Sequence, residues 1–211
     1  MSIRPMRAHG ICTDRWQQAK KMNKLNQHIK NLVSISDSYL SLILDKVVEK
    51  QFSKKEHLLY SDDYAKEVYF ISSGCVRTYI LDYNGIEHNI SFAIENWWLG
   101  DLQSFINHTP ANQNIQALED TVTFSINQED WNLLIKEIPE FVYYTRLLFR
   151  NTMFTHENRI LQNLSFTAEE RYLYFLNNYP DLSQRISQKH IASYIGITPE
   201  FLSMLRAKRK H

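Results

Sequence analysis

Hydrophobic residues follow three successive patterns along the chain, and each predicts a different kind of structure. From residue 23 to residue 50 the apolar positions recur at helical spacing, with a break at 34–38. From residue 51 to residue 126 apolar and polar positions alternate, and turn-forming pairs such as Asn84-Gly85 recur. This pattern predicts short antiparallel strands that close into a small barrel or roll. Helical spacing returns after residue 128.

A long helix is predicted over residues 140–163. Its large apolar side chains recur at heptad-like intervals, a spacing typical of helices that pack against another helix along a continuous seam. That seam lies either against the rest of the same chain or against a second copy. The seam residues are Leu147, Met153, Phe154, Ile160 and Leu161.

Two short helices hinged at a glycine are predicted near the carboxyl end. Ser187 and Thr198 are good N-caps, Pro199 suits a first helical position, and Gly196 between the helices allows a positive φ. The apolar positions of both helices face one small core; they are Ile191, Ala192, Ile195, Leu202 and Leu205. This is the pattern of a helix-turn-helix, whose second helix enters the major groove of DNA.

Charge is distributed unevenly along the chain. Residues 185–211 carry six Lys or Arg against one acidic residue, Glu200, although the net charge of the chain is only +1. Basic residues beside a helix-turn-helix are where contacts to DNA phosphates lie. The charge therefore favours DNA binding over a helical hairpin that only packs or binds another protein.

Composition narrows the class of protein. With 44% hydrophobic and 13% aromatic residues, the chain can form cores, while no apolar run reaches the length of a membrane span. We therefore expect a cytoplasmic protein that has no membrane partner. Its two cysteines, Cys12 and Cys75, are too few for a disulfide framework or a cysteine-ligated metal site. No catalytic motif stands out, so an enzyme is not expected.

The first 21 residues mix basic and polar side chains without a clear period. We expect residues 1–21 to be a disordered N-terminal extension, and folding to begin near Met22.

The order of these parts, and above all the run FTAEERYLYFLNNYPDLSQRISQKHIASYIGITPEFLSMLR, resembles the family of the cyclic-AMP receptor protein and the fumarate–nitrate regulators. The resemblance implies an α+β fold: an antiparallel β-roll of the cyclic-nucleotide-binding jelly-roll type with flanking helices over 22–138, a dimerisation helix over 139–163 and a helix-turn-helix domain over 164–211. It implies a homodimeric transcription regulator that binds double-stranded DNA, with RNA polymerase as a further partner.

The effector pocket that the resemblance implies departs from the family's nucleotide-binding pattern. The family's Gly-Glu-Leu turn falls on Gly100-Asp101-Leu102, and its Arg-Ser pair, whose Arg holds the cyclic phosphate, falls on Ala111-Asn112. No Lys or Arg occurs from residue 78 to residue 135. Because an unpaired phosphate is costly to bury, we expect cyclic AMP not to be the cofactor. The pocket then holds a less charged ligand, flanked by Trp97, Trp98, His156 and Glu157, or has collapsed.

The implied DNA-reading surface departs from the family as well. Glu200 matches a family Glu that suits the amino group of cytosine, whereas two family Arg positions that read guanine fall on Pro199 and Met204. The operator should therefore differ from that of the best-known members. The expected DNA-contacting residues are Lys189, Thr198, Glu200, Ser203, Met204, Arg206 and Lys208, of which the cations contact phosphates.

Two alternatives assign a different role to the β-roll. Gly85, His88, Glu95 and Gly100 follow part of the spacing of metal-binding cupins, but position 90 is Ile, where a cupin has a second histidine. In this alternative the roll binds a small molecule or a metal, and the helix-turn-helix serves protein interaction. A haem sensor that uses Cys75 is the other alternative.

Overall fold

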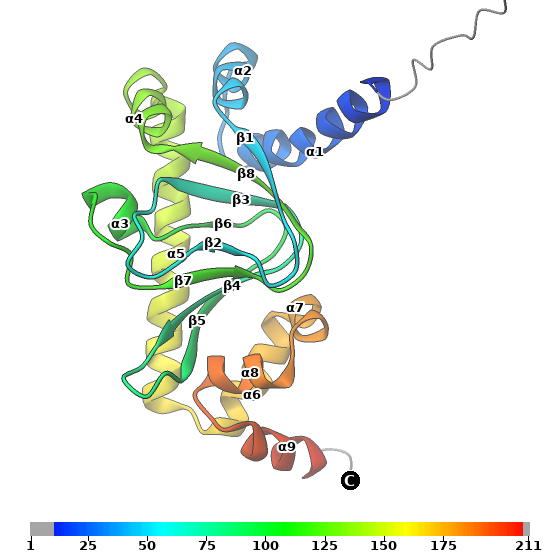
Figure 1. The fold of residues 1–211 in the computed structure, drawn as a ribbon, viewed down its shortest axis with the longest axis vertical. Coiled ribbons are helices and arrows are strands. Elements are labelled where there is room, and N and C mark those ends of the chain that lie inside the picture. Colours follow the sequence, from blue (N-terminus) through cyan, green and yellow to red (C-terminus); the bar gives the residue numbers. More distant parts are fainter. Residues whose placement is uncertain (1–10, 209–211) are drawn as a thin grey trace, which may run out of the picture.

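The computed structural model describes the backbone of residues 11–208 and the side chains of residues 22–208. Its centre is a jelly roll of two four-stranded antiparallel sheets, in the orders β1-β8-β3-β6 and β2-β7-β4-β5 (Figure 1). The roll expected from the alternating pattern is therefore present. The strands are β1 (Val48–Phe52), β2 (His57–Leu59), β3 (Glu67–Ser73), β4 (Val76–Leu81), β5 (Glu87–Ala93), β6 (Trp98–Leu99), β7 (Asn114–Ala117) and β8 (Thr121–Asn127).

Helices flank the roll at both of its chain ends. Helices α1 (Ile11–Leu32) and α2 (Asp37–Asp45) precede it and α4 (Gln128–Glu137) follows it, while α3 (Leu102–Asn107) lies between β6 and β7. Helix α1 begins at Ile11, which corrects the expectation of a disordered extension through residue 21; residues 1–10 lie outside the described residues. The predicted helix over 23–50 also ends early, because β-branched Val48 opens strand β1, which pairs with β8.

Aromatic and branched side chains fill the roll and attach the helices to it. Phe70 of β3 and Phe124 of β8 are buried in the sheet, and Leu25 of α1 packs into the same core. Phe141 and Tyr144, from the first turns of α5 (Pro139–Ser165), are fully buried there too. The first part of the long helix is thus fixed to the roll.

The β4–β5 hairpin turns at the predicted Asn84-Gly85 pair. Gly85 has a φ of +76°, where a side chain would be strained. The Asp82 carboxylate accepts the backbone N–H groups of Asn84 at 2.8 Å and of Ile86 at 2.9 Å, which closes the loop. The position of the turn is therefore set by local chemistry.

Helix α5 runs the length of the molecule and leads from the roll to the C-terminal helical domain (Figure 1). That domain comprises α6 (Ala168–Asn178), α7 (Pro180–Arg185), α8 (Gln188–Ile195) and α9 (Pro199–Lys208). Pro180 begins α7, where the missing N–H costs nothing.

The C-terminal domain packs against the second sheet of the roll. Cys75 and Phe92 from the roll share a buried cluster with Phe175 of α6 and Leu182 of α7. Arg185 adds ion pairs to Glu95, with an N–O distance of 2.7 Å, and to Glu119. The two domains are therefore joined by both apolar and ionic contacts.

Candidate functional site

The helix-turn-helix forms as the capping residues predict. The Ser187 hydroxyl accepts the His190 N–H at 3.3 Å, and the Thr198 hydroxyl accepts the Phe201 N–H at 3.2 Å. Between the helices Gly196 has a φ of +72°, so the chain reverses without strain. The apolar face is buried as expected: Ile191, Ala192, Ile195, Leu202 and Leu205 all lie in the core of the domain.

The opposite face of α9 is free. Every side chain expected to contact DNA is exposed, and α9 lies at the end of the molecule farthest from α1 and α2 (Figure 1). The exposed residues are Lys189, Thr198, Glu200, Ser203, Met204, Arg206 and Lys208. Phe201, which the sequence reasoning did not single out, adds an exposed aromatic ring to this face. A convex helix with cationic, polar and apolar groups is suited to the major groove.

Helix α5 carries an unpartnered apolar stripe along its second half. Met153, Ile160 and Leu164 recur at helical spacing, and Leu164 is 81% exposed. Phe154 and Leu161 flank them, whereas Leu147 packs against the core of the roll. Leu164 was not among the predicted seam residues, because it lies beyond residue 163, where the predicted helix ends. A stripe of this kind on a monomer marks a protein interface.

A cavity of about 370 Å³ lies between the roll and α5. Aromatic and aliphatic side chains from β5, β6 and α4, including Phe92, Trp98 and Trp131, form most of its wall. Thr78, Ser91 and Gln113 contribute polar groups. The cavity is therefore apolar with a few fixed hydrogen-bonding groups, which is the usual character of a small-molecule site.

The wall of this cavity contains no Lys, Arg, Asp or Glu among the described residues that form it. Its two histidines, His28 and His156, have pKa values below the ordinary value because burial disfavours the charged imidazole. The Tyr144 hydroxyl holds His28 Nδ1 at 2.8 Å and accepts the Trp98 indole N–H at 2.7 Å. At neutral pH the cavity is electrically neutral.

Comparison with known proteins agrees with this architecture. The model of the cyclic nucleotide-binding domain family matches residues 49–137. The regulatory protein HlyX of Actinobacillus pleuropneumoniae is 27% identical, with the alignment covering 77% of this chain and 72% of HlyX. The fumarate and nitrate reduction regulatory protein of Vibrio cholerae is 28% identical, covering 77% of this chain and 69% of that protein. The structure of FixK2 from Bradyrhizobium japonicum has a TM-score of 0.69 at 19% identity, covering 77% of this chain and 83% of FixK2.

In sequence and in fold the chain is similar to regulators of the Crp/Fnr family. Its relatives are regulators, in agreement with the expectation that it is not an enzyme.

The Crp/Fnr nucleotide turn has a structural role here. Asp101 is only 2% exposed and caps α3: its Oδ1 accepts the Ser104 N–H at 3.0 Å, and its Oδ2 accepts the Asn112 N–H at 3.3 Å. Gly100 and Leu102 line the cavity, but Asp101 does not. The expected position of Asp101 in the pocket is thus corrected, because its carboxylate is used to hold the turn.

Three other residues assigned to the Crp/Fnr pocket lie outside the cavity wall. Ala111 is buried and exchanges backbone hydrogen bonds with the 62–63 segment, while Asn112 is exposed. Glu157 falls on the same face of α5 as Met153 and Ile160, whereas His156 does line the cavity. One residue of difference along a helix rotates a side chain by about 100°, which separates His156 from Glu157.

Strand β5 is bonded directly to the helix-turn-helix, a contact that no sequence pattern indicated. The Ser193 hydroxyl on α8 accepts the Asn89 N–H at 2.9 Å and donates to the Glu87 carbonyl at 3.1 Å. Ile90, Ser91 and Phe92 of the same strand line the cavity. The strand thus touches the cavity on one side and α8 on the other.

A buried ionic group lies beside this contact. The Arg77 guanidinium donates to both Glu87 carboxylate oxygens, at 2.7 and 3.1 Å, and to the Gln116 side chain at 2.7 Å. His190 of α8 faces Arg77 with an Nδ1 to Nη1 distance of 3.5 Å. Burial and the Arg77 charge lower the pKa of His190 to about 4. Arg77 is therefore committed to Glu87 and Gln116 of the roll, beside the interface with the helix-turn-helix.

The described residues offer neither a metal site of the cupin kind nor a thiolate ligand for haem. No three His, Cys, Asp or Glu side chains from the described part of the chain lie close enough to hold a metal. Cys75 is fully buried between the domains, and burial raises the pKa of its thiol to about 12, which disfavours a thiolate ligand. None of the helices in residues 11–208 is both long and apolar enough to cross a lipid bilayer.

Proposed function

We propose that this Crp/Fnr regulator acts as a homodimer that reads an inverted-repeat operator through α9. The observation that carries the proposal is the pair of free surfaces on one chain: the exposed stripe of Met153, Ile160 and Leu164, and the exposed face of α9. Two copies joined along α5 present two α9 helices, which suits two half-sites about one helical turn apart.

Selection of bound duplexes from a random DNA library tests this proposal. Purified full-length protein at moderate salt is expected to enrich a two-fold symmetric site. Glu200→Ala should lose information at one base pair of each half-site, whereas Lys208→Gln should weaken binding to all duplexes alike. Enrichment of a single asymmetric half-site contradicts the proposal. So does the absence of any enriched sequence when the protein sediments as a dimer.

We also propose that the roll cavity takes a small uncharged ligand with a ring, rather than cyclic AMP. An anionic phosphate placed in the neutral cavity would lose its hydration without a cation to replace it. Trp98, Trp131 and Phe92 offer aromatic faces to a ring, and Thr78 and Gln113 offer hydrogen bonds to an alcohol or amide.

Calorimetry and thermal unfolding test the ligand class. Cyclic AMP is expected to give no saturable heat in the micromolar range, and uncharged aromatic alcohols or amides are expected to raise the unfolding temperature. Ser91→Phe, which fills the cavity, should remove that effect, while Ser203→Phe on α9 should keep it. Micromolar binding of cyclic AMP contradicts this assignment and leaves the DNA-binding proposal untouched.

RNA polymerase is the third partner that we propose, on the strength of the family assignment. Co-sedimentation of purified polymerase with the protein on its selected operator tests the interaction. Equal polymerase recruitment by operator DNA with and without the protein contradicts it.

A further inference from the structure

The imidazole of His190, on α8, faces two groups of the roll that can only donate hydrogen bonds. Its Nδ1 atom lies 3.5 Å from Nη1 of Arg77 and 3.3 Å from Nδ2 of Asn89. The orientation of the Asn89 amide is fixed, because its Nδ2 also lies 3.2 Å from the His190 carbonyl, which can only accept. Nδ1 is therefore the unprotonated nitrogen of a neutral imidazole, since a third donor at this point would face no acceptor.

Charged groups of the described chain face His190 from β4, β5 and α8. Arg77 of β4 and Lys189 of α8 oppose a positive imidazole, whereas Glu87 of β5 favours one. The Glu87 carboxylate, however, is bonded to Arg77 through both of its oxygens. Burial is the largest cause of the low pKa of His190, and the Arg77 charge adds to it. The protonated imidazole is thus disfavoured as long as α8 stays bonded to the roll.

We propose that His190 makes the contact between the roll and the helix-turn-helix sensitive to acid: protonation of its Nδ1 releases α8 from strand β5. Protonation turns Nδ1 from an acceptor into a donor, which then faces the Arg77 cation and the Asn89 amide. When α8 leaves the strand, water solvates the imidazolium. Arg77 keeps its bonds to Glu87 and Gln116 within the roll, so the release leaves no buried charge unpaired.

Release also breaks the bonds between Ser193 and β5. Ser193 follows His190 by three residues, so both side chains lie on the same face of α8. The Ser193 hydroxyl accepts the Asn89 N–H at 2.9 Å and donates to the Glu87 carbonyl at 3.1 Å. Because α8 and α9 share one apolar core, α9 moves with α8. Acid therefore changes the position of the exposed face of α9 relative to the roll.

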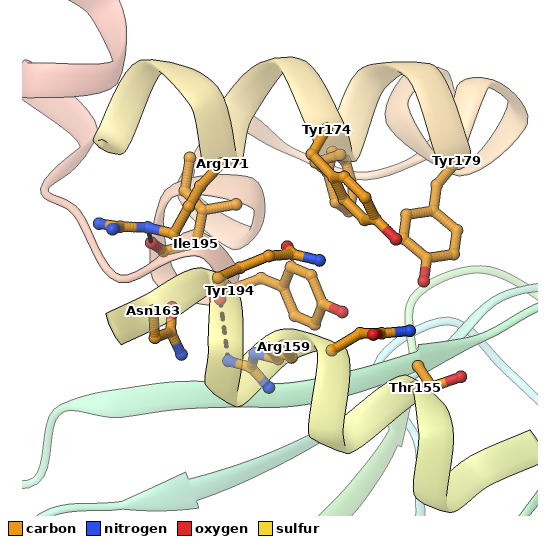
Figure 2. Close-up of a pocket in the computed structure, with 11 residues that line it drawn as sticks. Thr155, Arg159, Asn163, Arg171, Tyr174, Tyr179, Tyr194 and Ile195 are labelled. Carbon is orange, nitrogen blue, oxygen red and sulfur yellow. Dashed lines mark hydrogen bonds between the residues drawn. The ribbon is translucent and has the colours of Figure 1, made fainter. Parts of the chain in front are cut away.

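Other contacts limit how far α8 can move. Arg159 of α5 donates to the Tyr194 carbonyl at 2.8 Å (Figure 2) and to the Asn89 carbonyl at 2.9 Å. Arg185 of α7 pairs with Glu95 of the roll at 2.7 Å, and these bonds outweigh burial to lower the pKa of the Glu95 carboxyl. Both contacts keep their charges while the imidazole gains its proton. Acid thus loosens α8 without separating the two domains.

Amide hydrogen exchange of the full-length protein tests the proposal through the Asn89 N–H, whose acceptor is on α8. The quantity compared is the protection factor, in which the intrinsic effect of pH on exchange is divided out. Between pH 7 and pH 5 this factor should fall by on the order of tenfold, because the pKa of His190 is about 4 when α8 is bonded and ordinary when it is free. The Thr123 N–H, in the other sheet, should keep its protection.

Two variants assign the effect to the imidazole. His190→Asn keeps a side-chain acceptor that does not titrate, so the protection of the Asn89 N–H should no longer depend on pH. The matched control His108→Asn removes an exposed histidine and should keep the wild-type decrease. A nitrogen-15 spectrum of the imidazoles should show His190 Nδ1 without a proton at pH 7, and its protonation should accompany the loss of protection.

Constant protection of the Asn89 N–H in the wild-type protein overturns the proposal. So does a decrease of the same size in His190→Asn, or a His190 Nδ1 that carries the proton at pH 7. An equal loss of protection at Thr123 would show that acid opens the whole roll, and it overturns the proposal as well.

Discussion

The backbone N–H of Asn89 donates to the hydroxyl of Ser193 at 2.9 Å, and this bond joins strand β5 of the roll to the first helix of the helix-turn-helix. Asn89 is 2% exposed, so its N–H has little access to water if the hydroxyl is removed. The position of the helix-turn-helix is therefore sensitive to the exact path of strand β5, whose next residues line the roll cavity.

Replacing Ser193 by Ala should lower the free energy of unfolding by about 1 to 2 kcal/mol, because a buried donor loses its acceptor. Ser203→Ala on the exposed face of α9 is the matched control and should change it by less than about 0.5 kcal/mol. Urea unfolding followed by tryptophan fluorescence measures both. Equal stability of the two variants would show that the interdomain bond contributes nothing.

Stability should depend on pH through His190. Its pKa is about 4 in the folded protein against 6.5 for an ordinary histidine, so the unfolded chain binds more protons between these values. The free energy of unfolding therefore rises with pH from about 4 to 6.5, and this contribution is lost as pH falls. His190→Asn should reduce the change in unfolding temperature between pH 4 and pH 6.5. His108→Asn, at an exposed position, should keep the wild-type dependence of the unfolding temperature on pH. An unchanged slope in His190→Asn would place the pH dependence on other groups.

Base-specific and phosphate contacts should separate in binding measurements. Glu200→Ala should reduce discrimination at one base pair by about 1 to 3 kcal/mol, since its carboxylate suits the amino group of cytosine. Lys208→Gln should weaken binding to specific and random duplexes equally and lower the salt dependence. Fluorescence anisotropy over a salt series gives both quantities. Uniform loss on all sequences from Glu200→Ala would remove it from the reading surface.

The apolar stripe on α5 should control self-association. Ile160→Lys/Leu164→Lys should weaken the dimer by on the order of a hundredfold or more, because two apolar side chains per copy lose their burial. Asn177→Lys/Gln184→Lys adds the same charge to exposed positions of α6 and α7 and should leave association unchanged. Sedimentation velocity over a concentration series compares them. A wild-type protein that stays monomeric at all concentrations contradicts the homodimer itself.

Local signals in the sequence are sufficient to predict much of the fold. Ser187, Gly196 and Thr198 set the boundaries of two helices because capping and a positive φ are decided by neighbouring residues. Asn84-Gly85 marked the hairpin for the same reason. The sequence does not predict the short strands β2, β6 and β7 one by one, because each of them pairs with a segment that is distant in the sequence.

The candidate site was harder to predict where a residue type fits two roles. Asp101 matched a ligand position in the family pattern, but the same carboxylate is a good N-cap, and the structure uses it as one. Pro180 fits both the end of one helix and the start of the next. Arg159 gave no sequence signal, since its partners are backbone carbonyls on β5 and α8.

The two helices of the helix-turn-helix differ in how freely their residues can be substituted. Helix α8 is bonded to strand β5 through Ser193 and to Arg159 of α5 through the Tyr194 carbonyl, whereas the outward residues of α9, Glu200, Ser203 and Met204, are exposed to solvent. Substitutions on the outward face of α9, the surface proposed to read DNA, therefore leave the bonds between α8 and strand β5 in place. A foreign α8 that lacks Ser193 would lose the bonds to β5, so in the proposed function a new operator preference is confined to α9.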